Sequence, residues 1–213
     1  MKYQETREKV LEVAVKCLQQ GLIHGTAGNV SMRVPGEEVV IITPSGIPYD
    51  TLTPEQLPAV SFHGKVIDGD LKPSSETPMH TAIYRARDHV NGVVHTHSMF
   101  ATVFSILEKE IPAMVPPSSP YAPVPVAPFA LPGSEEMAAA AVKTLDKDHL
   151  CCTLQNHGLI TACPTLELAF KAAEYVEECA QVAYWTMMAG NMNPLPPEAA
   201  AELRARVLKG QAV

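Results

Sequence analysis

The segment NGVVHTHSMFATVFSIL, residues 91–107, shows how this chain alternates between strand and helix. Asparagine and glycine favour a turn, and the β-branched residues that follow predict a short strand. Side chains two residues apart lie on one face of a strand, so His95 and His97 are expected to point the same way. The apolar run Met99–Leu107 then predicts a helix directly after the histidines.

Between the N-terminus and this segment, the sequence predicts two helices and several strands. Apolar residues at helical spacing indicate the first helix, and the run EEVVIIT indicates a buried strand. A serine is available to cap the second helix, and Pro78 lies in its first turn. In chain order the elements are a helix over Tyr3–Gln20, a turn and strand over 25–34, a strand over 37–43, a hairpin over Ser61–Asp70 that turns at His63-Gly64 or at Asp68-Gly69, and a helix over Glu76–Asp88.

On the C-terminal side, eight prolines between Pro112 and Pro132 argue against regular structure and predict an ordered, partly extended loop. The segment CCTLQNHGLITA, residues 151–162, predicts a strand interrupted by a turn. Helices are predicted over Ser134–Leu145, over Thr165–Gly190 and over 198–210, the last in a tail that starts at Asn191.

The order of elements bears on the fold class. Strands and helices are intermixed along the chain, which favours a layered α/β domain. The regular rhythm of parallel β-α-β units is missing, so we expect a mixed sheet rather than a doubly wound one. With 213 residues the chain suits one domain over 1–213, in which 191–213 form a C-terminal helical tail.

Composition excludes several classes of protein. The net charge of -7, without a run of Lys and Arg, argues against nucleic-acid binding. Five cysteines without a CxxC pair predict reduced thiols rather than disulfides or a thiolate zinc site. No apolar stretch reaches the roughly 18 residues of a membrane span, and the charged N-terminus does not resemble a signal peptide. We therefore expect a cytoplasmic protein that does not bind membranes.

Three histidines are candidates for metal binding. His95 and His97 would direct two imidazoles at one point, and imidazole is a common ligand of divalent transition metals. Two ordinary histidines on a solvated strand face would give the same pattern. His157 lies within an apolar strand pair, where an unpaired imidazole is costly, so that either metal binding or a bond to a backbone carbonyl would explain it. Three histidines and a carboxylate would complete a zinc-type site with an open position.

Glu76, in KPSSETPMH, is the best candidate carboxylate because a helix start favours an anion. It could also simply complement the helix dipole while Ser75 caps the helix. The glycine-rich segments 25–31 and 43–46 could bind phosphate through backbone N–H groups, or could only be turns. His80 lies one helical turn after Glu76, where packing or a supporting role is expected. The other histidines are predicted to be structural or surface residues: His24, His63, His89 and His149.

Five motifs, in this order, resemble those of the class II aldolase and adducin-head family, and the resemblance spans about residues 5–190. They are GTAGNVS (25–31), TPSGIPY (43–49), KPSSETPMH (72–80), VVHTHS (93–98) and NHGLI (156–160). The resemblance implies a three-layer α/β/α sandwich with a central mixed, mostly antiparallel sheet, and a homotetramer. The family contains metal-dependent sugar-phosphate aldolases, epimerases and dehydratases, and also the non-enzymatic heads of adducins.

By this resemblance His95, His97 and His157 bind a divalent metal, zinc in the first place, with manganese, iron or cobalt as alternatives. Glu76 joins them in the resting enzyme and becomes the acid/base when substrate arrives. The complete ligand set favours an enzyme over an adducin-like binding module. The expected reaction is reversible cleavage of a ketose 1-phosphate to dihydroxyacetone phosphate and an aldehyde, with a ketose-phosphate 4-epimerase or dehydratase as the alternative. The positions that match the family's phosphate-binding residues are Gly28, Asn29, Ser45, Gly46, Ser74 and Ser75.

Two tyrosines of the family's aldolases are missing from their usual places. Proline stands where a tyrosine follows the IPA motif, with Tyr121 several residues further along, and no tyrosine follows Tyr184. The proline, alanine and valine of the loop predict an apolar wall beside the aldehyde, which could not hydrogen-bond sugar hydroxyls. Alternatively, the loop packs at a subunit interface and never meets the aldehyde. The first interpretation favours a deoxyketose phosphate as substrate.

Overall fold

A single eight-stranded sheet runs through the computed structural model, which describes residues 2–146, 149–209 and 211. The strand order is β4-β3-β2-β1-β5-β8-β7-β6, and neighbouring strands are antiparallel except β6 and β7, which are parallel. The strands are β1 (Gly28–Arg33), β2 (Val39–Ile42), β3 (Ala59–Ser61), β4 (Val66–Asp68), β5 (Gly92–Thr96), β6 (Val126–Ala127), β7 (Cys151–Leu154) and β8 (Gly158–Cys163).

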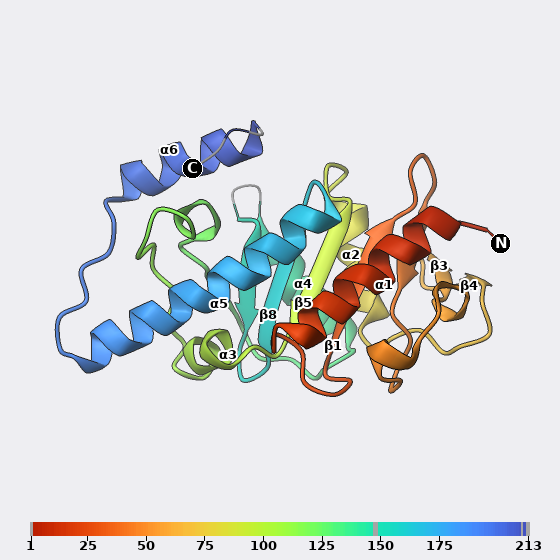
Figure 1. Cartoon of the computed structure of the whole chain (residues 1–213). Coiled ribbons are helices and arrows are strands. Elements are labelled where there is room, and N and C mark those ends of the chain that lie inside the picture. Colours follow the sequence, from red (N-terminus) through yellow and green to blue (C-terminus); the bar gives the residue numbers. More distant parts are fainter. Residues whose placement is uncertain (1, 147–148, 210, 212–213) are drawn as a thin grey trace.

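Helices cover both faces of the sheet. One apolar core lies between the sheet and the helices α1 (Gln4–Gln19), α3 (Met99–Ile106) and α5 (Leu166–Met188). A second core lies on the opposite face under α2 (Thr77–Ala86) and α4 (Glu135–Leu145). Figure 1 shows α1 and α5 crossing the same face of the sheet. The expected three-layer α/β/α sandwich with a mostly antiparallel sheet is confirmed.

The central strand β5 separates the two cores. All five of its residues are buried, with Val94 in the core under α1 and α5 and Val93 in the core under α2 and α4. His95 follows Val93 by two residues and therefore faces the α2 side. It is paired with Asn29 of β1 on one side and with Ile160 of β8 on the other. The ends of three adjacent strands thus meet around His95.

The predicted helices are present, with bounds shifted by a few residues, and the hairpin turns at His63-Gly64. The proline-rich segment is the ordered, partly extended loop that the sequence predicts, but it is not free of regular structure. This segment contains a 3-10 turn, η3 (Ser119–Tyr121), and the short strand β6. Proline is tolerated beside β6 because that strand lies at the edge of the sheet, where one side of its backbone needs no partner.

The C-terminal tail folds back onto the proline-rich segment. Its helix α6 (Pro197–Leu208) packs against η3, and the Arg204 guanidinium donates hydrogen bonds to the carbonyls of Pro120 and Ala122. Gly210, with which the predicted C-terminal helix ends, lies outside the described residues. In the part of the chain that the structure describes, the helices are too short or too polar to cross a membrane.

Candidate active site

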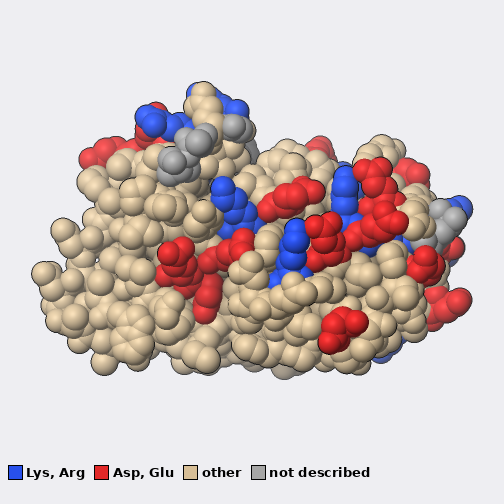
Figure 2. Space-filling model, in the orientation of Figure 1, with Lys and Arg blue, Asp and Glu red and all other residues tan. Residues whose placement is uncertain are grey.

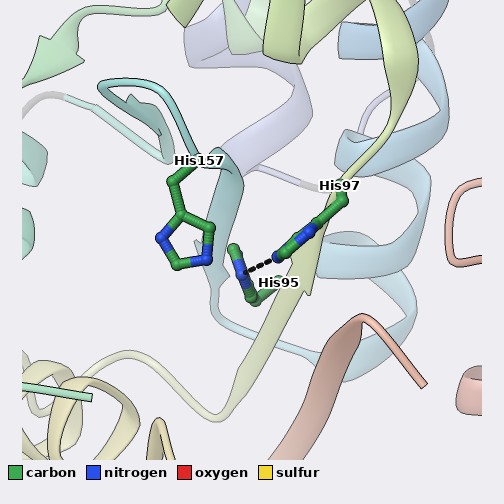
Figure 3. A group of neighbouring side chains, drawn as sticks. All are labelled: His95, His97 and His157. Carbon is green, nitrogen blue, oxygen red and sulfur yellow. Dashed lines mark hydrogen bonds between the residues drawn. The ribbon is translucent and has the colours of Figure 1, made fainter. Parts of the chain in front are cut away.

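Three imidazoles converge beyond the end of β5. His95 lies on the strand, His97 follows it directly, and His157 comes from the turn between β7 and β8. Nε2 of His95 is 3.0 Å from Nε2 of His97, and the candidate ligand atoms of all three rings lie within 4.8 Å of one another. Figure 3 shows the rings facing a common point.

The carboxylate of Glu76, at the start of α2, completes this cluster. One of its oxygens, Oε2, is 3.1 Å from Nε2 of His95, and the other, Oε1, is 3.2 Å from Nε2 of His157. The side-chain amide of Asn29 donates a hydrogen bond of 2.8 Å to Oε2. The start of helix α2, the end of strand β5 and the turn between β7 and β8 are therefore needed to bring the four candidate residues together.

The N-terminus of α2 differs from the sequence expectation. The residue at the N-cap position is Glu76 itself, and no side chain caps the helix. Ser74 instead accepts a hydrogen bond from the backbone N–H of Glu76, which braces the residue just before the helix. The Glu76 carboxylate points inward, where the Asn29 amide donates a hydrogen bond to it and where Nε2 of His95 and Nε2 of His157 lie close to its two oxygens.

Two glycines allow the backbone to close around the histidines. A β-carbon on Gly158 would lie 2.3 Å from the carbonyl oxygen of Thr96, and one on Gly28 would lie 2.8 Å from that of His95. Gly28 also has a φ of +135°, which other residues rarely adopt. The glycines of the AGN and NHG motifs are therefore required for strand packing beside His95.

The protonation states suit a cation. Burial raises the pKa of Glu76, but the interaction with His95 and the hydrogen bonds from His157 and Asn29 outweigh it and hold the pKa well below its ordinary value. Burial, followed by the neighbouring rings, lowers the pKa of His97 to about 4. Burial also lowers the pKa of His95. At neutral pH Glu76 is therefore ionised and His95 and His97 are neutral, and these are the protonation states that metal ligands require.

The geometry of the cluster fits a divalent metal. The Nδ1 atom of His95 donates to the carbonyl oxygen of Leu159 at 2.8 Å, so the neutral ring leaves the lone pair of Nε2 free. The 3.0 Å between Nε2 of His95 and Nε2 of His97 is close to the roughly 3.3 Å that tetrahedral zinc imposes on its nitrogen ligands. Two acceptor lone pairs at this distance repel each other unless a cation or a proton lies between them.

A pocket of about 280 Å³ opens beside the cluster. Glu76, His97 and His157 form part of its wall. The wall also includes all six positions that the sequence assigned to phosphate binding, which are Gly28, Asn29, Ser45, Gly46, Ser74 and Ser75. Backbone hydrogen bonds join the two segments that carry these serines. The N–H of Ser45 donates to the carbonyl of Lys72, and the N–H of Ser74 donates to the carbonyl of Thr43.

Sequence reasoning missed several residues at this site. Thr26 and Pro132 also line the pocket, and Thr26 lies within the GTAGNVS motif that had drawn attention to its neighbours. His80, for which the sequence predicts packing or a supporting role, is entirely buried behind Asn29, and its Nε2 lies 2.5 Å from Oδ1 of Asn29. The helical spacing of Glu76 and His80 was the signal for this placement.

His80 should make stability depend on pH. Burial, followed by repulsion from His95, lowers the pKa of His80 to about 3, whereas an unfolded chain restores about 6.5. The unfolded state binds the proton first as pH falls, so the stabilisation present above pH ~6.5 is lost between there and the folded-state value. We expect the metal-free protein to lose about 2 kcal/mol between pH 7.5 and pH 5 through this residue.

Urea unfolding of the metal-free wild-type protein and of His80→Gln at the two pH values checks this expectation. The wild type should lose more stability than the variant on acidification. Parallel losses in the two proteins would contradict it.

Comparison with known proteins agrees with the fold. The profile of the family described as "Class II Aldolase and Adducin N-terminal domain" matches residues 8–184. A 5-deoxy-D-ribulose 1-phosphate aldolase from Bacillus thuringiensis serovar kurstaki is 36% identical over 201 residues, which are 93% of each chain. The L-fuculose phosphate aldolase of Escherichia coli K12 is 36% identical over 89% of this chain and 86% of its own.

Solved structures show the same similarity. That of an L-fuculose 1-phosphate aldolase superposes with a TM-score of 0.92 at 28% identity, covering 97% of this chain and 98% of that one. The chain belongs to the class II aldolase and adducin N-terminal domain family. Within it, the chain is an enzyme of the aldolase type, a class II sugar-phosphate aldehyde-lyase.

Proposed function

We propose that this enzyme depends on a divalent metal and reversibly cleaves a ketose 1-phosphate into dihydroxyacetone phosphate and an aldehyde. The observation that carries the proposal is the direct contact between two features. Glu76, His97 and His157 of the cluster form one wall of a pocket whose other walls are glycine- and serine-rich turns, and His95 lies buried behind them. A phosphate bound by those turns would place the adjoining carbons of the substrate beside Glu76.

His95, His97 and His157 would hold the metal, with zinc as the first choice and manganese, iron or cobalt as alternatives. When bound, such a cation supplies Lewis-acid stabilisation of negative charge on the substrate's oxygens. Glu76 would take a proton from carbon in the synthetic direction and return it in the cleavage direction. The side-chain amide of Asn29 orients the carboxylate by donating a hydrogen bond to it.

The reaction is tested by incubating the metal-loaded enzyme with four candidate substrates and measuring release of dihydroxyacetone phosphate. These are fuculose 1-phosphate, ribulose 1-phosphate, a deoxyribulose 1-phosphate and ribulose 5-phosphate. Release from one or more of the 1-phosphates is expected. Release from none would contradict the aldolase, and conversion of ribulose 5-phosphate into its 4-epimer would establish the epimerase alternative.

Among ketose 1-phosphates, we propose that the natural substrate is a deoxyketose. Pro132 is the residue of the proline-rich segment that lines the pocket, and it has no group that could donate a hydrogen bond to a hydroxyl. Phe129 and Leu131, close to it in sequence, are apolar and largely exposed. The name of the Bacillus relative, a 5-deoxy-D-ribulose 1-phosphate aldolase, supports a substrate with an apolar end.

An apolar wall predicts tolerance towards aldehydes. In the synthetic direction, kcat/KM for acetaldehyde and for L-lactaldehyde should differ by no more than the roughly 10- to 200-fold that apolar contacts provide. Replacement of dihydroxyacetone phosphate by dihydroxyacetone should be tolerated far less, because the phosphate positions are complete. A preference for L-lactaldehyde of several hundredfold would contradict the apolar wall and favour fuculose 1-phosphate.

We also propose a homotetramer in the cytoplasm. Apolar side chains are exposed on α3 and at the C-terminal end of α5, and Figure 2 shows few charges over these elements. The exposed residues are Met99, Ile106, Trp185 and Met188. All five cysteines are free and buried, which supports a reducing compartment. Light scattering coupled to gel filtration measures the assembly, and a monomer at micromolar concentration would contradict it.

A further inference from the structure

We infer that His80 is a positioning residue of this site, which acts on Glu76 through Asn29. His80 is fully buried on α2 and does not line the pocket. Its role would be to hold the side-chain amide of Asn29 in the orientation that directs an N–H group at the carboxylate. This inference rests on the proposed function, because it concerns the residue to which we assign proton transfer.

Two rows of side chains face each other between α2 and β1. Glu76 at the start of α2 and then His80 and Tyr84 follow one another at intervals of one helical turn, or about 6 Å. Asn29 and Ser31 are two residues apart on β1, or about 6.7 Å. Since the two repeats nearly match, each strand residue can bind two helix residues.

The contacts form one continuous chain of hydrogen bonds. Nδ2 of Asn29 lies 2.8 Å from Glu76, and Oδ1 of Asn29 lies 2.5 Å from Nε2 of His80. Nδ1 of His80 lies 2.6 Å from the hydroxyl of Ser31. The hydroxyl of Tyr84 lies 3.0 Å from that hydroxyl and 3.0 Å from the carbonyl oxygen of Ser31.

The directions of these bonds follow from the carboxylate. An ionised Glu76 only accepts, so Asn29 must present its NH₂ group to it and its oxygen to His80. His80 must then carry its proton on Nε2, and its Nδ1 accepts the proton of the Ser31 hydroxyl. Tyr84 donates its hydroxyl proton to the carbonyl oxygen of Ser31 and lies beside the Ser31 hydroxyl at the end of the chain. In this arrangement both ring nitrogens of His80 have a hydrogen-bond partner of the right kind.

His80 therefore decides how firmly Asn29 is held. Without the Nε2–H donor, Oδ1 of Asn29 would be a buried acceptor without a partner, and the amide would be released from its present orientation. A rotated amide would turn its oxygen towards the Glu76 carboxylate and repel it. Proton transfer depends on the position of that carboxylate, so turnover should suffer more than substrate binding.

The test compares His80→Leu, which removes the donor, with His80→Gln, whose amide N–H can replace it. In His80→Leu we expect kcat to fall by about 10- to 100-fold, as is typical for residues behind a catalytic group, while metal content is retained. KM for the ketose phosphate should change by less than about threefold, because the substitution leaves the backbone of the phosphate-binding turns, including that of Asn29, in place. His80→Gln should recover most of the lost turnover. Thr81→Val is the matched control, buried on the same helix but outside the chain of hydrogen bonds, and should keep wild-type turnover.

A double-mutant cycle shows whether the effect passes through Asn29. In an Asn29→Ala background, His80→Leu should lower kcat by less than about twofold further, because its target is gone. Multiplicative losses, or equal losses in the Leu and Gln variants, would overturn the inference. If His80→Leu does not fold, Ser31→Ala takes its place in the same cycle, since it frees the His80 ring while keeping the residue. A wild-type enzyme that releases no dihydroxyacetone phosphate would instead count against the proposed function.

Discussion

Replacing His97 by alanine is expected to remove most of the bound metal and to lower kcat/KM by at least about 10³-fold, because Lewis-acid stabilisation is worth several kcal/mol. The same result is expected for His95→Ala and His157→Ala. Each ring contributes one of three converging nitrogens, and two imidazoles with one carboxylate would bind the metal far more weakly. Elemental analysis of the purified variants measures the metal, and dihydroxyacetone phosphate release measures the activity.

These variants should remain folded, which separates loss of a ligand from loss of structure. His97 and His157 are only partly buried, so their replacement by alanine leaves little cavity in the core. His95 is fully buried, so His95→Ala should destabilise the fold most of the three. His63→Ala is a matched control because His63 is exposed on the β3–β4 turn, outside the cluster, and this variant should keep its metal and activity. Stoichiometric metal in all three variants of the cluster would show that the site is wrong.

The second large effect is expected for Glu76→Gln, which should lower turnover by at least about 10²-fold, since an amide cannot accept the proton. Metal should be largely retained through the three imidazoles. The amide of Asn29 would then face another amide, which can still accept a hydrogen bond through its oxygen, so the packing around α2 should survive. Single-turnover measurements on the metal-loaded variant test the chemical step directly.

Inhibition by inorganic phosphate is the control for Glu76→Gln. The turns that line the pocket are untouched by this change, so the inhibition constant should stay close to that of the wild type. Near-normal turnover would remove Glu76 from the mechanism. Loss of both metal and phosphate binding would show instead that the change disturbs the fold of the pocket.

Much of the fold could be predicted from local patterns. The helices and the β3–β4 hairpin depend on periodicity and turn residues that lie within a few positions of each other, and the structure places them where these patterns indicate. Strand β6 could not be predicted in this way. Its partner β7 lies some 25 residues further along the chain, and the prolines around it argue against regular structure until the edge position is known.

For the candidate site, the sequence by itself determined which residue types could hold a metal and a phosphate. The four candidate ligands and the six pocket positions could be predicted from the spacing of His95 and His97, from the glycine of NHG and from the family motifs. Their roles stay predictions until the variants are measured.

Only the tertiary structure decided how these residues meet. Asn29 was named for phosphate, yet its amide binds Glu76, and His80 lies behind it as the next member of a buried chain. Such contacts depend on the packing of α2 against β1, which are separated by more than forty residues in sequence. Sequence spacing determines which side chains share a face of one element, whereas the register between two elements is set by the packing of the whole core.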